Sequence, residues 1–571
     1  MESGQQEENS RLFMDDINTT TETIVQSKYL LTALVEKLDW AKLTAKPAKC
    51  RCLILNKGEV SKRTLDIKGQ PMTRLSEKPI KYLGKEYNDT LSDREQVEAT
   101  MASAKEYLKK VDKDKLPGRY KSWILQHMIL LKIMWPIMIY DFPASKVEEI
   151  ERLFTRYLKK WLGLPRSLNV NALYSSTAKL QLPFSAVTEE ARVAKARKLV
   201  TLQTSTDKCI SGANISVEAG RKWNISSEVE EARSRLRMQD ITGTANQGRL
   251  GLGMQHNPVY ATSSEKEKRK LITEKIRTKD EEVRRIRMGE LGSQGRSNAW
   301  EVPERKLSSR DIINTSEAAL KFLVRSVYEL LPTPSNKNTW FRTEEFKCDL
   351  CQGEGTLNHI FSGCPVALAQ GRYRWRHDKV LREIAKHVEK RRVEAKKPVF
   401  EKPRHIQFVK EGHRRWVDRE QEKPAKRSYL SEATDWELRV DLEKRLKFPE
   451  FIATTNLRPD MLLISETQRH LGMIELTVPG EERIEVSHEL KLNRYAALVE
   501  EARRKGWKTK LWAVEVGVRG FPASSMALFL GEIGISGGER TRILRKIGEQ
   551  AERGSNTIWN MSRVKKWGKA E

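Results

Sequence analysis

The sequence predicts a multidomain α+β protein with several separate cores. The chain has 571 residues, which is too long for one hydrophobic core, and 38% of them are hydrophobic, which is enough to fill several. Strand and helix patterns are mixed over residues 11–95, helices dominate residues 96–335, and an α/β pattern returns from about residue 434. A short cysteine-rich segment, residues 347–365, precedes that last part.

The charge balance favours a polyanionic partner. Lys and Arg number 105 against 77 Asp and Glu, so the net charge is +28. Each phosphate contact of such a chain releases condensed counterions, which favours nucleic acid. A generic basic surface and an anionic membrane are the alternatives. The most apolar stretch, residues 123–140, is interrupted by Gln126, His127, Lys132 and Pro136, so we expect buried helices there and no membrane partner.

Cysteine usage and the first residues indicate a reducing compartment. Residues 1–10 are polar and acidic, so no secretory signal is expected. Six cysteines in so long a chain do not indicate a disulfide scaffold, and three of them share one short motif. We therefore expect the cytosol or the nucleus.

The elements before the cysteine-rich segment follow from hydrophobic spacing. A short apolar run at residues 11–14 precedes Asp15 and Asp16, and residues 23–38 carry apolar side chains at helical spacing. Short strands are predicted at residues 52–55 and 80–83. Residues 96–200 are predicted helical with breaks at 116–118 and 163–165, and residues 264–288 alternate acid and base, which predicts a solvated helix.

The cysteine-rich segment predicts a zinc knuckle. Cys348, Cys351, His359 and Cys364 have the spacing C-x2-C-x7-H-x4-C, and three thiolates with one imidazole can close a tetrahedron around Zn²⁺. Four ligands leave no open position, so the zinc would be structural. We expect Gly353, Gly355 and Gly363 to supply backbone freedom. The alternative is three buried cysteines that happen to lie close.

A strongly basic segment follows the knuckle. Residues 390–430 hold fourteen Lys and Arg against six Asp and Glu, interleaved with Phe408, Trp416 and Tyr429. Such a segment is either a plain basic linker or an arm that tracks phosphates and stacks bases on its aromatic rings. The sequence leaves both interpretations open.

Two carboxylates at the start of the last α/β part predict a divalent-metal site. Asp460 precedes a strand at residues 461–464, and Glu475 lies in a strand at residues 473–478. A hairpin turning near Thr467 and Gln468 would place Asp460 and Glu475 almost opposite each other. Two such carboxylates repel unless a cation lies between them, and their oxygens suit Mg²⁺ or Mn²⁺. The metal would align a water and polarise a scissile phosphate.

A helix after this hairpin adds two candidate residues. Ser487 is the predicted N-cap of a helix through about Lys505, and Gly506 ends it. On this helix Lys491 and Tyr495 are four residues apart and share a face. Lys491 could stabilise a pentavalent phosphate or position the water. A further buried strand is predicted at residues 511–516 with Glu515 inside it. Alternatively, Asp460 simply begins a strand and Lys491 is an ordinary exposed residue.

This part of the chain resembles the restriction-like endonuclease of LINE-type (non-LTR) retrotransposons, a variant of the PD-(D/E)xK nuclease fold. In that family the motif lysine has moved from the strand to the following helix, and here Thr477 stands where a strand lysine would be. The resemblance implies that Asp460 and Glu475 are magnesium ligands and that Lys491 is the catalytic lysine. Tyr495 matches a recurrent tyrosine of the helix. The second carboxylate is often Asp, so Glu475 is a departure that the wider fold accepts.

The resemblance continues upstream of the nuclease part. The same family places a C-x2-C-x7-H-x4-C knuckle just before its nuclease, and the segments Thr-Leu-Asn-His at 356–359 and Gly-Arg-Tyr-Arg-Trp-Arg-His-Asp at 371–378 resemble its sequence there. Trp-Leu-Gly-Leu-Pro at 161–165 and Leu-Pro-Phe at 182–184 resemble the thumb region and the segment after it.

The first residues resemble part of a polymerase palm. Phe-Met-Asp-Asp at 13–16 resembles the F/Y-x-D-D turn of reverse transcriptases, in which Asp15 and Asp16 would hold catalytic Mg²⁺, although Asp-Asp before a helix is more often a cap. Lys-Pro-Ala-Lys at 46–49 resembles the lysine motif that follows, and the primer grip is resembled by residues 80–84, with Tyr82, Leu83 and Gly84.

The parts that should precede these landmarks are missing from the sequence. The resemblance therefore implies a protein that is amino-terminally truncated within the palm. Phosphoryl transfer depends on the complete metal cage, so we expect no primer extension by this chain alone.

The resemblance implies six segments. They are a partial reverse-transcriptase palm at 1–95, a helical thumb at 96–200, a charged helical linker at 201–335, a CCHC zinc knuckle at 336–370, a basic linker at 371–430 and an α/β PD-(D/E)xK-like endonuclease at 431–571. The expected partners are target DNA and element RNA, the expected cofactors are structural Zn and catalytic Mg or Mn, and the expected location is the nucleus, or the cytoplasm before import.

The expected function is metal-dependent nicking of DNA by a retrotransposon-derived protein. A catalytically silent nucleic-acid-binding protein and the product of a decayed element are the alternatives. Phosphate contacts carry little sequence information, so weak sequence preference and steep salt dependence are expected.

Overall fold

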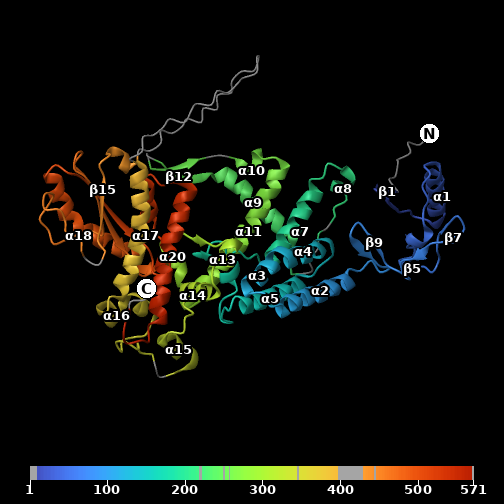
Figure 1. Cartoon of the computed structure of the whole chain (residues 1–571). Coiled ribbons are helices and arrows are strands. Elements are labelled where there is room, and N and C mark those ends of the chain that lie inside the picture. Colours follow the sequence, from blue (N-terminus) through green and yellow to red (C-terminus); the bar gives the residue numbers. More distant parts are fainter. Residues whose placement is uncertain are drawn as a thin grey trace, which may run out of the picture. The chain divides into compact units, whose positions relative to one another are not determined.

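The computed structural model describes residues 10–568 apart from 216, 218–221, 249–250, 256–257, 344–345, 396–427 and 443–444. Most of the basic segment predicted at 390–430, with Phe408 and Trp416, therefore lies outside the described residues. The protein is mixed α/β, with many helices and small sheets (Figure 1). It divides into two compact units, Met1–Tyr157 with Ser185–Asp280 and Leu158–Phe184 with Glu281–Glu571.

Unit 1 begins with short two-stranded sheets around one helix. Its elements up to residue 87 are β1 (Ser10–Phe13), β2 (Asp16–Thr19), α1 (Ile24–Trp40), η1 (Pro47–Lys49), β3 (Arg51–Cys52), β4 (Leu55–Asn56), β5 (Glu59–Val60), β6 (Asp66–Ile67), β7 (Gln70–Pro71), β8 (Thr73–Arg74), β9 (Ile80–Tyr82) and β10 (Lys85–Tyr87). The predicted helix is confirmed, and it starts at a capping box in which the Thr23 hydroxyl and the Gln26 side chain each accept a backbone hydrogen bond. The strand predicted at 80–83 is confirmed as β9, and the strand predicted at 52–55 divides between β3 and β4.

The rest of unit 1 is mostly helical. Its elements are α2 (Arg94–Lys113), α3 (Gly118–Ile124), η2 (Leu125–Ile129), α4 (Leu130–Ile139), α5 (Ala144–Trp161), α7 (Val187–Gln203), α8 (Lys208–Gly212), α9 (Ile225–Thr242), β12 (Thr244–Gly248), β13 (Gly251–Gln255), α10 (Val259–Thr262) and α11 (Glu265–Gly289). Helices α5 and α11 each continue into unit 2.

Helices α3, η2 and α4 run on as one helix, Gly118–Ile139, which in length and composition could cross a membrane and is the one such helix among the described residues. Side chains on one of its faces, including Leu125, Ile129 and Ile133, are buried, and the helix contacts α2 and α7.

The expectation of a solvated helix at residues 264–288 is wrong for one face of it. Helix α11 is present, but Ile272 and Ile276 are 1% and 3% exposed. Beside them Arg277 donates hydrogen bonds to the carboxylates of Glu189 and Glu190 on α7. The sequence pattern does not reveal this packing. Charged residues that pair with a neighbouring helix look the same in the sequence as charged residues that face solvent.

Unit 2 holds a small helical part, the cysteine-rich segment and a four-stranded sheet. Its elements after α5 and α11 are α6 (Asn171–Tyr174), β11 (Leu180–Gln181), α12 (Gly292–Gly295), η3 (Arg296–Ala299), β14 (Arg305–Lys306), α13 (Ser309–Asn314), α14 (Glu317–Val327), α15 (Pro334–Phe341), η4 (His359–Gly363), α16 (Pro365–Ala369), α17 (Arg372–Ala395), η5 (Tyr429–Glu432), β15 (Glu437–Val440), β16 (Met461–Ser465), β17 (His470–Thr477), η6 (Glu481–Arg483), α18 (Ile484–Arg504), β18 (Lys508–Glu515), α19 (Ser524–Glu532) and α20 (Gly537–Asn560).

The sheet of unit 2 has the strand order β15-β16-β17-β18. Strands β15, β16 and β17 are antiparallel neighbours, whereas β18 runs parallel to β17 after the crossover through α18. The predicted hairpin is confirmed: Ser465 pairs with His470 and Met461 pairs with Ile474, so the loop holds Glu466–Arg469. The predicted strand at 511–516 is also confirmed, as part of β18.

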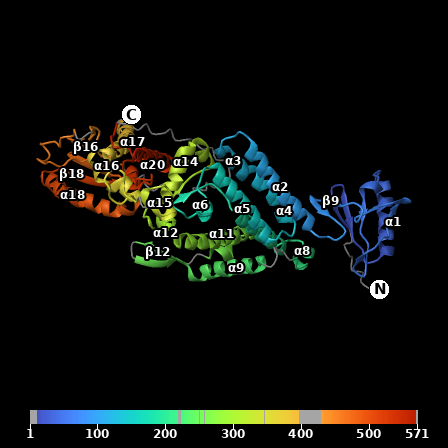
Figure 2. The ribbon, with the colours of Figure 1, turned by 90° about the horizontal axis from the view of Figure 1, so that it is seen from below.

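Helices cover both faces of this sheet, because alternate side chains of a strand point to opposite faces. Met461 and Leu463 lie in one core with α17, α19 and α20, whereas Leu462 and Ile464 lie in a second core with α18. Helices α17 and α20 lie side by side in both views of the ribbon (Figures 1 and 2). The sequence places residues 372–395 in a basic linker, but Val380, Leu381, Ile384 and Val388 of α17 are completely buried in the first core.

A buried ion network ties the sheet to the segments before it. The guanidinium of Arg519, which is 1% exposed, donates to Glu481 at 2.7 Å, to the carbonyl oxygen of Ser326 at 3.0 Å and to the side chain of Asn358 at 3.2 Å. It also pairs with Glu329 at 2.5 Å. Because Asn358 neighbours a predicted zinc ligand, the network fixes the cysteine-rich segment against the end of β18 and α14.

Candidate functional site

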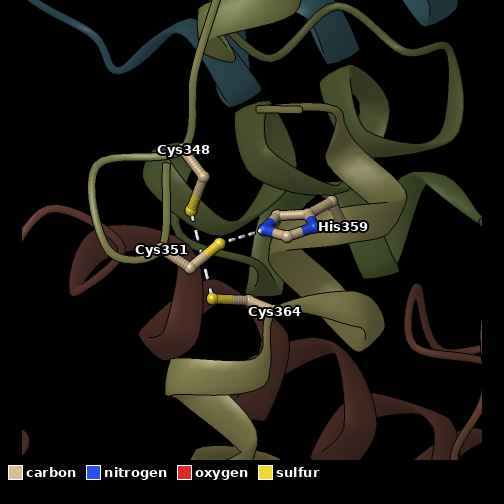
Figure 3. Close-up of side chains that lie close together, drawn as sticks. All are labelled: Cys348, Cys351, His359 and Cys364. Atoms are coloured by element: carbon tan, nitrogen blue, oxygen red, sulfur yellow. Dashed lines mark hydrogen bonds between the residues drawn. The ribbon is translucent and has the colours of Figure 1, made fainter. Parts of the chain in front are cut away.

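The four predicted zinc ligands come together. Their ligand atoms, from Cys348, Cys351, His359 and Cys364, all lie within 4.8 Å of one another (Figure 3). The Sγ atoms of Cys348 and Cys364 are 4.0 Å apart, and Cys351 Sγ is 3.1 Å from His359 Nε2. A tetrahedron with Zn–S bonds of about 2.3 Å has S···S edges of about 3.8 Å. The cluster can therefore hold a metal such as zinc.

The protonation behaviour of two ligands matches this interpretation. Burial lowers the pKa of His359, which leaves a neutral imidazole that can bind a metal through nitrogen. Burial raises the pKa of Cys364 to about 11, so without a metal the thiol stays protonated. Metal binding at this cluster would therefore release protons.

The segments between the last three ligands differ from expectation in their glycines. None of Gly353, Gly355 and Gly363 has a positive φ, and the residue with left-handed backbone is Gln352 at φ 62°. Space explains Gly355 instead, since a Cβ there would lie 2.7 Å from Cβ of Pro334. The prediction of backbone freedom at these glycines is therefore wrong, and close packing on α15 is the physical reason for Gly355.

Asp460 and Glu475 lie next to each other at one end of the sheet. The register of β16 with β17 continues to this pair, and the backbone N–H of Asp460 donates to Glu475 Oε2 at 3.3 Å. Their exposed fractions are 4% and 3%. Oδ2 of Asp460 accepts a hydrogen bond of 2.8 Å from the N–H of Leu476, so its orientation is fixed by the backbone of β17.

Helix α18 brings Lys491 and Tyr495 to the same two carboxylates. Nζ of Lys491 is paired with Oε1 of Glu475, and the Tyr495 hydroxyl donates to the carbonyl oxygen of Arg458 at 3.0 Å and faces Glu475. Tyr495 is 1% exposed, whereas the side chain of Lys491 is 24% exposed. The four residues predicted from the sequence are thus gathered in one place, with only the lysine partly open to solvent.

The start of α18 differs from the prediction. The helix begins at Ile484 after the turn η6, and Arg483 is its N-cap, so Ser487 lies inside the first turns and is not the cap. The turn η6 supplies the helix start because Glu481 is held by Arg519, which fixes the backbone there. The predicted end is confirmed, since Lys505 is the C-cap and Gly506 has φ +85°.

Burial and neighbouring charges shift the pKa values of Glu475 and Tyr495. Burial and the neighbouring Asp460 both raise the pKa of Glu475, and Lys491 opposes them. Burial and the charge of Glu475 raise the pKa of Tyr495 far above its ordinary value, so its hydroxyl stays protonated as a donor. The hydroxyl of Thr477, on the same face of β17 as Glu475, has no hydrogen-bond partner among the described residues.

Helix α17 adds residues that sequence reasoning did not assign to this site. His377 Nε2 lies 3.1 Å from Asp460 Oδ2 and 3.3 Å from the carbonyl oxygen of Leu476, and its Nδ1 lies 3.1 Å from Asp378. Burial lowers the pKa of His377, but the hydrogen bonds to Asp378 and Asp460 outweigh burial and raise it to about 9. The ring is therefore an imidazolium at neutral pH.

Arg374 adds Asp441 to this group and contacts two carboxylates already in it. Its guanidinium lies 2.8 Å from Asp378, 3.4 Å from Asp441 and 4.0 Å from Asp460. Asp441, which is 2% exposed, follows β15, and its N–H donates to the carbonyl oxygen of Asp460. The spacing of Arg374, His377 and Asp378 on one helix face was the available signal in the sequence.

The polymerase-like residues lie in unit 1. Met14 and Asp15 form the turn of the β1–β2 hairpin and Asp16 begins β2; all three are exposed, and Met14 has a left-handed φ of 54°. In the β9–β10 hairpin Tyr82 ends the first strand and Leu83 and Gly84 form the turn, with φ values of 48° and 84°. A Cβ at Gly84 would lie 3.3 Å from the ring of Trp135.

Comparison with protein-family models finds none that matches this chain, and comparison with curated proteins finds no significant similarity.

Proposed function

We propose that this protein nicks DNA by metal-dependent hydrolysis of a phosphodiester bond, with Asp460, Glu475, Lys491 and Tyr495 as its active-site residues. The observation that carries the proposal is the buried pair Asp460–Glu475 at one end of the sheet, with Lys491 on a crossing helix paired to it. Two carboxylates this close and this poorly solvated are held together at a cost, which a bound divalent cation offsets.

The residues fit Mg²⁺ or Mn²⁺. One or two carboxylates with waters and substrate phosphate oxygens are the usual ligand set of Mg²⁺. Oδ2 of Asp460 is occupied by the Leu476 N–H and His377, so Oδ1, which lies 4.0 Å from Nη1 of Arg374, is the oxygen that would bind the cation. The unpartnered hydroxyl of Thr477 is a further oxygen on this face. A cation bound here supplies the charge that polarises the phosphate and acidifies the attacking water.

The chain's own residues then have distinct roles. Lys491 is partly open to solvent. When substrate is bound, its ammonium would contact the scissile phosphate as well as Glu475, and would neutralise negative charge on that phosphate. Tyr495 holds Glu475 and the backbone before Asp460 through one hydroxyl. His377 and Arg374 keep the surrounding carboxylates oriented.

The identity that this function supports is a LINE-type retrotransposon protein. The CCHC order of the metal cluster just before the sheet, and a helical rather than a strand lysine, agree with the resemblance stated above. In this proposal the zinc is structural, unit 1 contains the incomplete polymerase palm and part of the thumb, target DNA and element RNA are the partners, and the protein works in the nucleus.

One observation favours a catalytically silent nucleic-acid-binding protein instead. Lys491, His377 and Arg374 already neutralise the carboxylates of the site, so the cluster can also persist as a closed set of ion pairs. A metal-binding site predicts that added Mg²⁺ activates nicking of DNA, whereas a closed ion-pair cluster predicts that Mg²⁺ has no such effect.

The deciding experiment incubates purified protein with supercoiled plasmid in the presence of Mg²⁺, Mn²⁺ or Ca²⁺, with no chelator so that the cysteine cluster keeps its metal. We expect Mg²⁺ or Mn²⁺ to yield nicked circles. Asp460→Asn, Glu475→Gln and Lys491→Met should each lower the rate by about a hundredfold or more.

The matched control is Glu466→Gln, which changes an exposed acid in the loop of the same hairpin and should leave nicking unchanged. Nicking that persists in Asp460→Asn would assign the activity to a contaminant and leave the silent binder as the function.

A further inference from the structure

A surface on α17 and the tail after α20 has cations without carboxylate partners. The tryptophan–lysine surface consists of Trp375, Lys379 and Arg382 of α17, Arg553 of α20, and Lys565, Lys566 and Trp567 of the tail. Among the described residues the structure gives no carboxylate within ion-pair distance of Lys379, Arg382, Lys565 or Lys566. By contrast, Lys390, Arg391 and Arg392 farther along α17 are each paired with a glutamate.

Three cations of this surface, Lys379, Arg382 and Arg553, repel one another. Burial together with the charges of Arg382 and Arg553 lowers the pKa of Lys379, and no acid opposes them. Arg553 is the exception that has a partner, because Glu549 lies 3.6 Å away and is shared with Arg545. Clustered like charges of this kind are unfavourable in the free protein and are neutralised by an anion that spans them.

The aromatic rings hold this charge in a defined place. Nζ of Lys379 lies 4.1 Å from the centre of the Trp375 ring, and Trp375 meets Trp567 edge to face at 5.5 Å between ring centres. The ammonium is therefore fixed by a cation–π contact instead of being free in solvent.

The tail backbone is anchored by hydrogen bonds to its carbonyl oxygens. The completely buried Arg372 donates to those of Met561 and Val564, each at 2.7 Å, and Gln370 donates to that of Lys565 at 2.7 Å. The exposed side chains of Lys565 and Lys566 thus extend from a fixed backbone, which lowers the entropy lost when they bind.

The surface shares helix α17 with the candidate active site but points in a different direction. Arg374 and His377 of α17 face Asp460, whereas Trp375, Lys379 and Arg382, at spacings of four and three residues, lie on average more than about a third of a turn away around the helix axis. A helix with its side chains is about 10–12 Å across, so a duplex with one phosphate at Asp460 can place further phosphates against this surface.

From these contacts we propose that the tryptophan–lysine surface binds the sugar–phosphate backbone of the duplex DNA that is cut. The inference rests on the proposed nuclease function, because it names the partner of the same protein. The binding is electrostatic and independent of base sequence, and it holds the duplex on the protein while the bond is cut.

The test measures binding to a fluorescently labelled DNA duplex by anisotropy over a series of salt concentrations, in the Asp460→Asn background without added Mg²⁺. Removing Lys379, Arg382 and Lys566 together by alanine should weaken binding about tenfold or more. The slope of log K against log salt should fall by about 0.9 for each phosphate that the variant no longer neutralises. The charge reversal Lys566→Glu, at an exposed tail position, should weaken binding on its own.

The matched control removes three exposed cations at the other end of α18 and the start of β18, with Arg504→Ala, Lys505→Ala and Lys508→Ala, and should leave affinity and slope unchanged. Arg504 is thirteen residues from Lys491 in the sequence, about 20 Å along the helix. Equal effects of the two triple variants would overturn the inference, as would a weakening confined to duplex RNA. If the surface variant binds and nicks DNA normally, the inference is wrong and the nuclease proposal stands. If the wild-type protein does not nick plasmid but its DNA binding depends on the surface, the nuclease proposal is wrong and the binding surface stands.

Discussion

Nε2 of His377 lies 3.1 Å from Oδ2 of Asp460, although 83 residues separate the two in the chain. The Leu476 N–H donates to the same oxygen, so Oδ2 is fully engaged, whereas Oδ1 lies 4.0 Å from Nη1 of Arg374. His377 is in turn held by Asp378. Through these linked hydrogen bonds, α17 contributes His377 and Asp378 to the candidate site at the end of the sheet.

Replacing His377 should therefore weaken metal use. We expect His377→Ala to raise the Mg²⁺ concentration needed for half-maximal nicking by about tenfold, because a group that orients a ligand contributes about that much to affinity. The measurement is the nicking rate against Mg²⁺ concentration. His387→Ala on the same helix, where His387 pairs with Glu383, is the control. An unchanged Mg²⁺ dependence in His377→Ala would contradict the orienting role.

Elemental analysis should find one zinc ion per chain. Cys351→Ser should lose it and melt at a lower temperature, because the free energy of zinc binding is part of the folding free energy of such a module. Cys209→Ser changes an exposed cysteine far from the cluster in sequence and should keep both zinc and melting temperature. Full zinc content in Cys351→Ser would show that the metal sits elsewhere.

Arg519 should be among the residues most important for the stability of unit 2. Arg519→Met leaves Glu481 and Glu329 buried without their cation, which should lower the free energy of unfolding by about 3–5 kcal/mol. Urea unfolding measures this value. Arg545→Met removes an arginine that is 51% exposed and should cost less than about 1 kcal/mol. If combining Arg519→Met with Glu481→Gln recovers no stability, the destabilisation has another cause.

The stability of the fold at acid pH should depend on the carboxylate of Asp435, which accepts two hydrogen bonds. Burial raises its pKa, but hydrogen bonds from the Ser465 hydroxyl at 2.5 Å and the Thr467 N–H at 3.0 Å outweigh that and lower it to about 2. A lowered pKa stabilises the fold above the unfolded value of about 3.9, and this stabilisation disappears as pH falls toward about 2. Wild type should therefore unfold at higher urea than Asp435→Asn at neutral pH, and the difference should vanish between about pH 4 and pH 2. A difference that is constant with pH would rule out this carboxylate as its source.

The sequence alone is sufficient to predict which residues meet where their contacts are local in the chain. Asp460 and Glu475 are joined by a short hairpin, so strand alternation alone puts both on the α18 face, and the four-residue spacing of Lys491 and Tyr495 does the rest. The zinc ligands lie within one short segment for the same reason.

The sequence alone is insufficient to predict contacts between residues that are far apart in the chain. Asp441 meets Arg374 across 67 residues, and α17 joins the core on one face of the sheet although its first half is as charged as a linker. The wrong helix start at Ser487 has the same origin, because Arg519, 32 residues further on, fixes the turn that begins α18.

The packing of α20 along α17 has a consequence for how the protein is made. Ile543, Ile547 and Ala551 of α20 complete the core on one face of the sheet. A ribosome that stalls or meets a stop codon before Gly537 releases a polypeptide whose sheet lacks this cover. Such a product lacks part of the core that supports Asp460 and Glu475, so we expect the candidate site to assemble only in polypeptides that include α20.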